Sequence, residues 1–218
     1  MTLCRYPEQI DSNHGRKGVK LKMESHFVAY LYRLKYIKRW SLMRNITHES
    51  VSEHTFHVAL LTHLLGTIAN EVYGKSLPTD QLVTAALFHD ATEVFTGDIP
   101  TPVKHQNPDI LANFRKIEEN AAERLTQMIP EELRPVYQPL LGGAKRKTDN
   151  PYYIYIKAAD LLDAYIKCSM EVSAGNREFA IAKQQIGESL RQLNLPEVGY
   201  FMEKFGPSLE KTLDEISE

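Results

Sequence analysis

Apolar side chains recur every three or four positions through most of this chain, and this spacing restricts its fold more than any other feature. In the first such stretch, "SHFVAYLYRLKYIKRW", Phe27, Tyr30, Leu31 and Leu34 share one face of a helix that Ser25 would cap. The run "YYIYI" has strand-forming residues, but it continues into a helical pattern of alanine and leucine. The sequence therefore predicts an all-α fold, a single bundle of about eight or nine helices.

Capping residues, prolines and glycines set the expected helix boundaries. Ser50 or Ser52 would cap a second helix that ends near Gly74, and Asn107 followed by Pro108 would begin a long one. Further helices are expected at 79–95, at 130–140 with a break at Pro135 or Pro139, and at 152–174, 177–192 and 197–215. The stretch 142–151, "GGAKRKTDNP", is expected to be a loop. Residues 25–218 would form one domain and residues 1–24 an N-terminal extension.

Charge and cysteine content restrict the setting in which the chain works. Its 218 residues carry a formal net charge of −2, so no overall field attracts a nucleic-acid polymer or an acidic membrane. Cys4 and Cys168 follow no metal or redox spacing, which fits a reducing compartment. No apolar run approaches the roughly 18 residues of a membrane span, and the first twenty residues lack the apolar core of a secretory signal. We expect a cytoplasmic protein with no membrane and no nucleic-acid partner.

Three of the expected helices carry ionisable residues among apolar neighbours. His54 points with the apolar stripe of "VSEHTFHVALL". In "AALFHDATEVFTGDIPTP", His89, Asp90 and Glu93 form one polar edge at the end of an apolar helix. Asp160 lies inside the alanine-rich stretch "YIKAADLLDAYIK". A bare charge is costly to bury, so each of these groups needs a partner.

A metal ion would supply that partner for all of them at once. Two neutral imidazoles, His54 and His89, with two carboxylates, Asp90 and Asp160, would offset one divalent cation. Mixed nitrogen and oxygen ligands suit Mn²⁺, Fe²⁺, Co²⁺, Ni²⁺ or Zn²⁺. Simpler explanations exist for single residues. A lone histidine on an apolar face is usually hydrogen-bonded in the core, and Asp160 would then pair with a basic side chain, Lys157 or Arg44. The order His, His-Asp, Asp favours the metal site.

This order resembles the H…HD…D pattern of the HD-domain superfamily of metal-dependent phosphohydrolases. Longer stretches resemble one family within it, the bacterial 5′-deoxynucleotidases: "RWSLMRN", "VSEHTFHVA", "FHDATEVFTGDIPTPVK", "KAADLLDAYIKC" and "AGNREF". The likeness runs from about Ser25 to the end of the chain. It implies an all-helical enzyme that removes phosphate from deoxyribonucleoside 5′-monophosphates with little base selectivity. It also implies a homodimer that works with Co²⁺ or another transition divalent.

The resemblance also assigns roles to individual residues. The metal ligands would be His54, His89, Asp90 and Asp160, of which His54, Asp90 and Asp160 would also lie against the substrate. Two residues would be catalytic: Glu93, acting on water, and Arg39, orienting the phosphate. The remaining substrate contacts would be Trp40, Asp98, Ile99, Pro100 and Thr101.

Other interpretations of these residues and of the function stay open on sequence alone. Glu93 would otherwise orient His89, Arg39 would be a surface charge at a helix end, and Trp40 would be a core anchor. The same site in another HD-domain enzyme would serve a dNTP triphosphohydrolase or a cyclic-nucleotide phosphodiesterase. A catalytically idle nucleotide-binding module is the third alternative. It would be expected to lack a ligand or Glu93, and all are present.

Overall fold

The computed structural model describes residues 24–104, 106–142 and 150–217. Almost all of the expected N-terminal extension (1–24) and most of the expected loop at 142–151 lie outside these residues.

The described residues are helical, with one isolated antiparallel bridge between Lys38 and Ser50, and the all-α prediction is confirmed. The longer helices are α2 (Val51–Glu71), α3 (Thr79–Ala86), α6 (Pro108–Gln127), α7 (Arg134–Leu141), α9 (Tyr153–Ser173), α10 (Ala180–Gln192) and α11 (Pro196–Lys204). The α-helices of one turn are α1 (Phe27–Leu31), α4 (Glu93–Thr96), α5 (Thr101–Lys104) and α12 (Leu213–Ser217). Four 3₁₀ helices join them: η1 (Tyr32–Tyr36), η2 (Glu131–Leu133), η3 (Arg177–Phe179) and η4 (Gly206–Ser208). The described part thus holds eleven α-helices, more than eight or nine, because several expected helices divide into short pieces.

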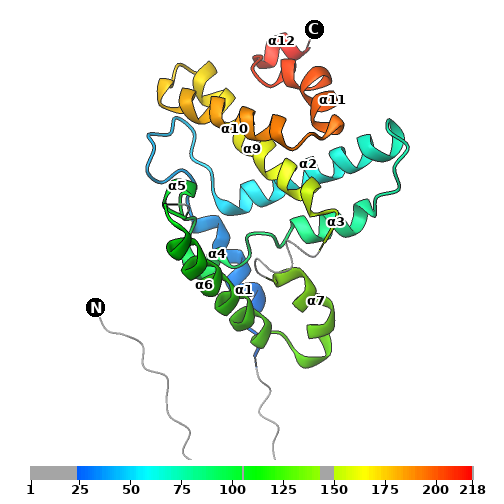
Figure 1. The fold of residues 1–218 in the computed structure, drawn as a ribbon. Helices are drawn as coiled ribbons and strands as arrows, with labels where there is room; N and C mark the ends of the chain where they lie inside the picture. Colours follow the sequence, from blue (N-terminus) through cyan, green and yellow to red (C-terminus); the bar gives the residue numbers. More distant parts are fainter. Residues whose placement is uncertain (1–23, 105, 143–149, 218) are drawn as a thin grey trace, which may run out of the picture.

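Helices α2 and α9 form the centre of the molecule (Figure 1). Ser50, one of the two serines expected to cap this helix, begins α2 in a capping box with Glu53. The buried stripe of α2, which includes Val58 and Leu65, packs with Ile156 and Leu162 of α9 in the larger core cluster. In the part of the chain that is described, no helix combines the length and apolar character needed to cross a membrane.

Helix α3 approaches α2 closely at Gly66. A Cβ atom at Gly66 would lie 2.9 Å from the side-chain oxygen of Thr79, so only glycine fits this crossing without a shift. Thr79 is the first residue of α3, so this contact fixes how the start of α3 packs against α2.

A second, smaller core cluster lies beneath the turn that follows α3. It contains Phe27 of α1, Ala91 of the turn at 87–92, Leu125 of α6, and also Ile129 and Leu141. In Figure 1, α1, α4, α6 and α7 gather in one half of the molecule, and α10, α11 and α12 lie in the other. Ala91 belongs to this cluster and directly follows His89 and Asp90, so these two residues lie at its edge.

The prediction of one continuous helix at 79–95 is wrong. Helix α3 ends at Ala86, turns occupy 87–92, and α4 begins at Glu93. The His89 backbone N–H and its ring Nδ1 both bond the carbonyl of Ala86, at 3.3 and 2.8 Å. This carbonyl is therefore occupied by a residue three positions on, which tightens the chain into a turn. The polar edge at His89, Asp90 and Glu93 is built on this turn.

Some of the other predicted helix boundaries are confirmed and others are wrong. Asn107 caps α6 with Pro108 at its first position, as predicted. Gly175 follows the end of α9 at a φ of 89°. Ser25 does not cap the first helix, which is preceded by His26 and turns into η1 at Tyr32. Pro139 lies inside α7 without ending it. The expected helix at 197–215 is divided into α11, η4 and α12.

Candidate active site

His54 lies in the first turns of α2 and is fully buried. Its Nδ1 lies 2.6 Å from Oδ2 of Asp163, on α9. Hydrogen bonds from His54 and His57 outweigh the effect of burial and lower the pKa of Asp163 to about 2, so this carboxylate is ionised and accepts the Nδ1 hydrogen. The Nε2 lone pair of His54 is left for another partner.

His89 is held in the same way by a different group. Its Nδ1 donates to the Ala86 carbonyl at 2.8 Å, and its Nε2 faces Asp90 Oδ2 at 3.1 Å. Both histidines therefore have Nδ1 fixed by a hydrogen bond, which leaves Nε2 as the ligand atom.

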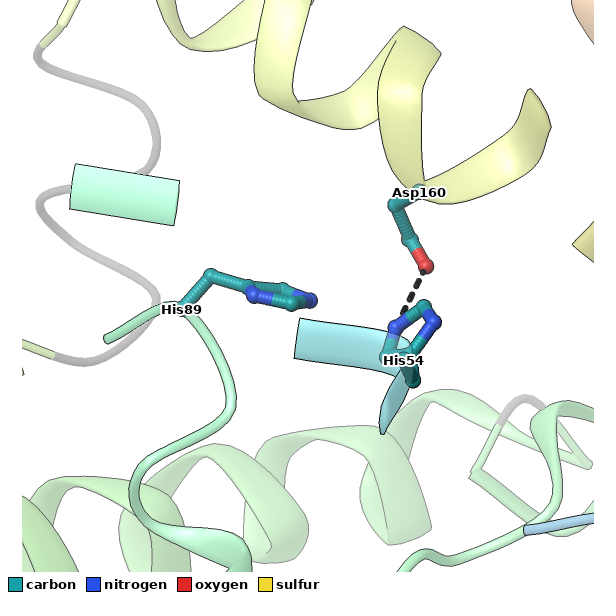
Figure 2. A group of neighbouring side chains, drawn as sticks. All are labelled: His54, His89 and Asp160. Atoms are coloured by element: carbon teal, nitrogen blue, oxygen red, sulfur yellow. Dashed lines mark ion pairs between the residues drawn. The ribbon is translucent and has the colours of Figure 1, made fainter. Parts of the chain in front are cut away.

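Asp90 and Asp160 complete the cluster. His54 Nε2 lies 3.5 Å from Asp90 Oδ2 and 3.4 Å from Asp160 Oδ1. Figure 2 shows His89 and Asp160 converging on His54 from separate segments. The ligand atoms of His54, His89 and Asp160 all lie within 4.8 Å of one another, a spacing that suits one ion. The structure thus brings together the four residues expected to hold a metal.

The electrostatics of this cluster favour a cation. Burial disfavours a charged His54, yet the neighbouring carboxylates of Asp160, Asp163 and Asp90 raise its pKa well above its usual value. Burial likewise opposes ionisation of Asp90 and Asp160, but His89 and His54 hold the pKa of both carboxyls below the usual range. The carboxylates thus favour positive charge beside His54 Nε2.

The polar atoms of this cluster fit a divalent metal. Nε2 of His54 and Nε2 of His89 are buried, and neither has a hydrogen-bond partner among the described residues. Two such nitrogens beside two carboxylates form a neutralising nitrogen and oxygen ligand set for one divalent cation. The donor set does not select one transition metal over another.

Glu93 begins α4, one turn after Asp90, and is 7% exposed. Burial, followed by the charges of Asp90 and Asp98, raises the pKa of Glu93 to about 9. Its Oε2 is buried with no partner among the described residues, and Oε1 lies 3.9 Å from Lys104 Nζ. Glu93 forms no hydrogen bond with His89 in the described residues, which favours a role in proton transfer over the alternative of orienting His89.

Arg39 lies beside the cluster rather than at the surface. Its Nη1 lies 2.8 Å from Glu49 Oε2 and 3.4 Å from Asp163 Oδ2, and its side chain is 12% exposed. These carboxylates, with Asp160 and Asp90, raise its pKa above the usual value despite burial. Asp163 therefore contacts both a proposed metal ligand and the proposed phosphate-binding arginine.

Trp40 follows Arg39 in an unusual conformation. Its φ is 55°, a left-handed conformation that a bulky side chain rarely adopts. Its ring packs 5.4 Å from that of Phe179, and the Arg39 guanidinium lies 5.8 Å from its centroid. Its indole Nε1 is buried and lacks a partner in the described ranges.

Within the described ranges, fewer contacts connect the segment from Asp98 to Thr101 with the metal cluster. Gly97, at a φ of 70°, ends α4, and Thr101 begins α5. Asp98 is near enough to Glu93 to raise its pKa. Ile99, Pro100 and Thr101 follow along the same segment, with Thr101 exposed. Helix α5 ends at Lys104, which lies between Glu93 and Glu118, 3.8 Å from the latter.

Sequence reasoning missed Asp163 and Glu49 as parts of the site. Asp163 lies one turn after Asp160 on α9, and this spacing to a proposed ligand was the signal that could have identified it. Glu49 lies in the segment before α2 and carried no such signal. Glu49, His54 and Asp163 are close enough together to suggest another metal group. The guanidinium of Arg39 already bridges the two carboxylates, so they need no further cation.

Comparisons with known proteins agree with this geometry. A family model described as "5′-deoxynucleotidase YfbR-like" matches residues 26–209. A 5′-deoxynucleotidase of Vibrio cholerae serotype O1 is 45% identical over 194 residues, which is 89% of this chain and 99% of that protein. A 5′-deoxynucleotidase of Erwinia tasmaniensis is 45% identical over 196 residues, covering 90% of this chain and 98% of its own length.

Two solved structures of similar fold are described as HD-domain phosphohydrolases. One from Listeria innocua superposes with a TM-score of 0.74 at 24% identity, over 84% of this chain and 88% of that one. Another, from cyanophage S-2L, bound to dA and one catalytic Zn²⁺, has a TM-score of 0.54 at 20% identity, over 84% and 96%. At these identities the likeness supports the fold. The family match covers most of the chain and the curated relatives are 45% identical, so the chain belongs to the YfbR-like 5′-deoxynucleotidase family.

Proposed function

We propose that this protein hydrolyses deoxyribonucleoside 5′-monophosphates to the deoxyribonucleoside and phosphate, with little selectivity for the base. The observation that carries the proposal is the convergence of two buried histidine Nε2 atoms, neither hydrogen-bonded within the described residues, with Asp90 and Asp160, one turn from a buried Glu93. The 5′-deoxynucleotidases of 45% identity match this chain across nearly their whole length, which supports the choice of substrate.

His54, His89, Asp90 and Asp160 would hold one divalent transition metal. Such a metal lowers the pKa of a bound water and polarises a phosphate oxygen. We propose Co²⁺ as the ion that supports activity best in vitro, with Mn²⁺, Zn²⁺, Ni²⁺ and Fe²⁺ as alternatives. The zinc bound to the cyanophage protein supports a divalent ion in this fold.

Glu93 would transfer the proton in the reaction, acting first as general base and then as general acid. When water attacks phosphorus, one proton must leave the water and one must reach the departing 5′ oxygen. Burial and two neighbouring carboxylates hold the pKa of Glu93 at about 9, and a cation among the ligands would lower it toward neutral pH. Glu93 would then take the proton from water and pass it to the 5′ oxygen as the P–O bond breaks.

Arg39 and Trp40 would hold the sugar and phosphate. Among the described residues, both ion pairs of Arg39 use Nη1, which leaves Nη2 and Nε to donate to phosphate oxygens. Trp40 would pack on the deoxyribose and exclude a 2′-hydroxyl. Asp98, Ile99, Pro100 and Thr101 would line the rest of the nucleotide site, and His54, Asp90 and Asp160 would face the phosphate.

We further propose a single domain over residues 25–218 that forms a homodimer in the cytoplasm. Exposed apolar side chains on the surface of α2, Phe56 at 63% and Leu60 at 58%, support association. The free, buried thiol of Cys168 supports a reducing compartment.

The test is phosphate release from dAMP, AMP and 3′-dAMP by protein stripped of metal and reloaded with single ions. We expect release from dAMP in the loaded protein, less from AMP, and none from 3′-dAMP. A protein that binds metal but releases phosphate from none of these would contradict the proposal. Preferential hydrolysis of dATP or of a cyclic nucleotide would favour the other HD-domain activities, and equal rates on dAMP and AMP would contradict the role of Trp40.

A further inference from the structure

A buried ion pair lies outside the metal cluster. Lys167 and Glu171 face each other one turn apart on α9, with residue exposures of 7% and 2%. Burying two charges costs free energy that their attraction does not always recover. Neither residue contacts a proposed metal ligand, so the metal cluster does not account for the pair.

What Glu171 holds is the loop between Trp40 and Glu49. Its Oε2 accepts the backbone N–H of Ile46 at 3.0 Å, and its Oε1 accepts that of Thr47 at 3.1 Å. Lys167 donates both to Glu171 and to the carbonyl of Thr47. The pair therefore fixes the backbone of two consecutive loop residues through donors and acceptors alike.

Asparagine side chains extend this network toward Trp40. Nδ2 of Asn176 donates to Glu171 Oε2 at 2.8 Å and to the Arg44 carbonyl at 2.7 Å. Within the loop, Nδ2 of Asn45 donates to the carbonyls of Met43 at 2.9 Å and Trp40 at 3.1 Å. A continuous set of bonded segments thus runs from the end of α9 to the residue after Arg39.

The ring of Trp40 is held from the same side. Phe179 is fully buried, packs against Trp40 and lies 5.6 Å from Lys167 Nζ. A tryptophan at positive φ keeps that conformation only where its surroundings enforce it. Phe179 and the Glu171 network supply this enforcement. They also explain the motif "AGNREF", whose Asn176 and Phe179 make the contacts.

We infer that Glu171, supported by Asn176 and Phe179, is a positioning residue for the Arg39–Trp40 turn and so controls how tightly and how selectively the site holds the sugar and phosphate. The effect on selectivity rests on the proposed function, whereas the effect on Trp40 does not. None of the three side chains touches the metal cluster, so metal binding is independent of them.

The test compares Glu171→Gln with Glu210→Gln. Glutamine keeps the shape of Glu171 and removes its charge. Glu210 is a half-exposed carboxylate paired with Lys183 at 2.5 Å, and in the described ranges its side chain is bonded to no residue of the loop. For Glu171→Gln we expect a fall in kcat/KM for dAMP on the order of 10- to 100-fold, mostly through KM, a smaller preference for dAMP over AMP, and unchanged metal content. Glu210→Gln should match the wild type in all of these.

Fluorescence gives a readout that needs no activity, because Trp40 is the only tryptophan in the chain. Glu171→Gln should shift Trp40 emission to longer wavelength and increase its quenching by acrylamide. Unchanged quenching and an unchanged KM in folded Glu171→Gln protein would overturn the inference. If that variant does not fold, Phe179→Leu should produce the same shift with the ion pair intact, and no shift there would also overturn it. Increased quenching in a protein that releases phosphate from no nucleotide would overturn the proposed function and support the positioning role.

Discussion

Asp163 Oδ2 accepts the Nδ1 hydrogen of His54 at 2.6 Å, and this bond decides which nitrogen of His54 faces the metal cluster. The same carboxylate lies 3.4 Å from Arg39 Nη1 and, through Oδ1, 3.3 Å from His57 Nδ1. One side chain thus fixes the orientation of a proposed ligand and of the proposed phosphate-binding arginine.

Replacing Asp163 by Asn should weaken metal binding without removing a ligand. An amide orients His54 less firmly and lowers the basicity of its Nε2, and changes of this kind typically cost about 10- to 100-fold in affinity. Metal competition with a chromogenic chelator measures the effect, and Asp214→Asn on exposed α12 is the control. An Asp163→Asn affinity equal to that of the control would contradict this role.

Asp160→Asn should lower metal content more than Asp163→Asn does, because it removes a charged ligand atom. Its Oδ1 lies 3.4 Å from His54 Nε2, within the predicted coordination sphere. Elemental analysis after dialysis measures the bound ion. Full occupancy in this variant would place Asp160 outside that sphere, where pairing with Lys157, 3.6 Å away, would be its role.

Glu93→Gln should keep the metal and lose most turnover. Glutamine cannot exchange a proton, and such groups contribute about 10²- to 10⁴-fold to rate. The measurement is kcat on dAMP beside metal content, with Glu118→Gln as the matched variant because Glu118 also faces Lys104. Near-normal kcat in Glu93→Gln would exclude Glu93 as the proton carrier.

The stabilisation supplied by Glu171 should depend on pH in a defined direction. Although burial opposes its ionisation, bonds from Lys167 and from the Ile46, Thr47 and Asn176 groups lower its pKa from 4.5 to about 2. A depressed folded-state pKa means that the contribution is complete above about pH 4.5 and is lost as pH falls toward 2.

The measurement is urea unfolding of the wild type and Glu171→Gln at several pH values. The wild type should be more stable by about 1–3 kcal/mol at pH 7, and the difference should shrink below pH 4.5. A difference that stays constant from pH 7 to 3 would show that the charge of Glu171 is not the cause.

Much of the fold followed from local sequence signals. Ser50 and Asn107 began their helices as predicted because capping depends on a few adjacent residues. The stretch 79–95 could not be divided from its periodicity, because the break at 87–92 depends on a ring-to-backbone bond between His89 and Ala86. Apolar spacing is nearly the same with or without that bond.

The residues proposed as ligands could be picked out from the sequence, whereas the residues that support them could not. His54 and Asp160 could be identified because each is a polar residue in an apolar pattern. Glu49 and the anchoring role of Glu171 could not, since each depends on contacts between segments far apart in sequence, such as Glu171 with Ile46. The positive φ of Trp40 has no sequence signal either, because tryptophan rarely adopts that conformation.

The His54–Asp163 bond joins positions 109 residues apart, on α2 and α9. The selected tautomer, and with it a competent chelating pocket, therefore exists only after these two helices have docked. An unfolded chain would offer only scattered, weak ligands, so ion uptake would follow folding rather than guide it. Metal binding to the folded state would then shift the unfolding equilibrium toward that state. The concentration of free metal in the cell would therefore affect both the stability of the enzyme and its rate.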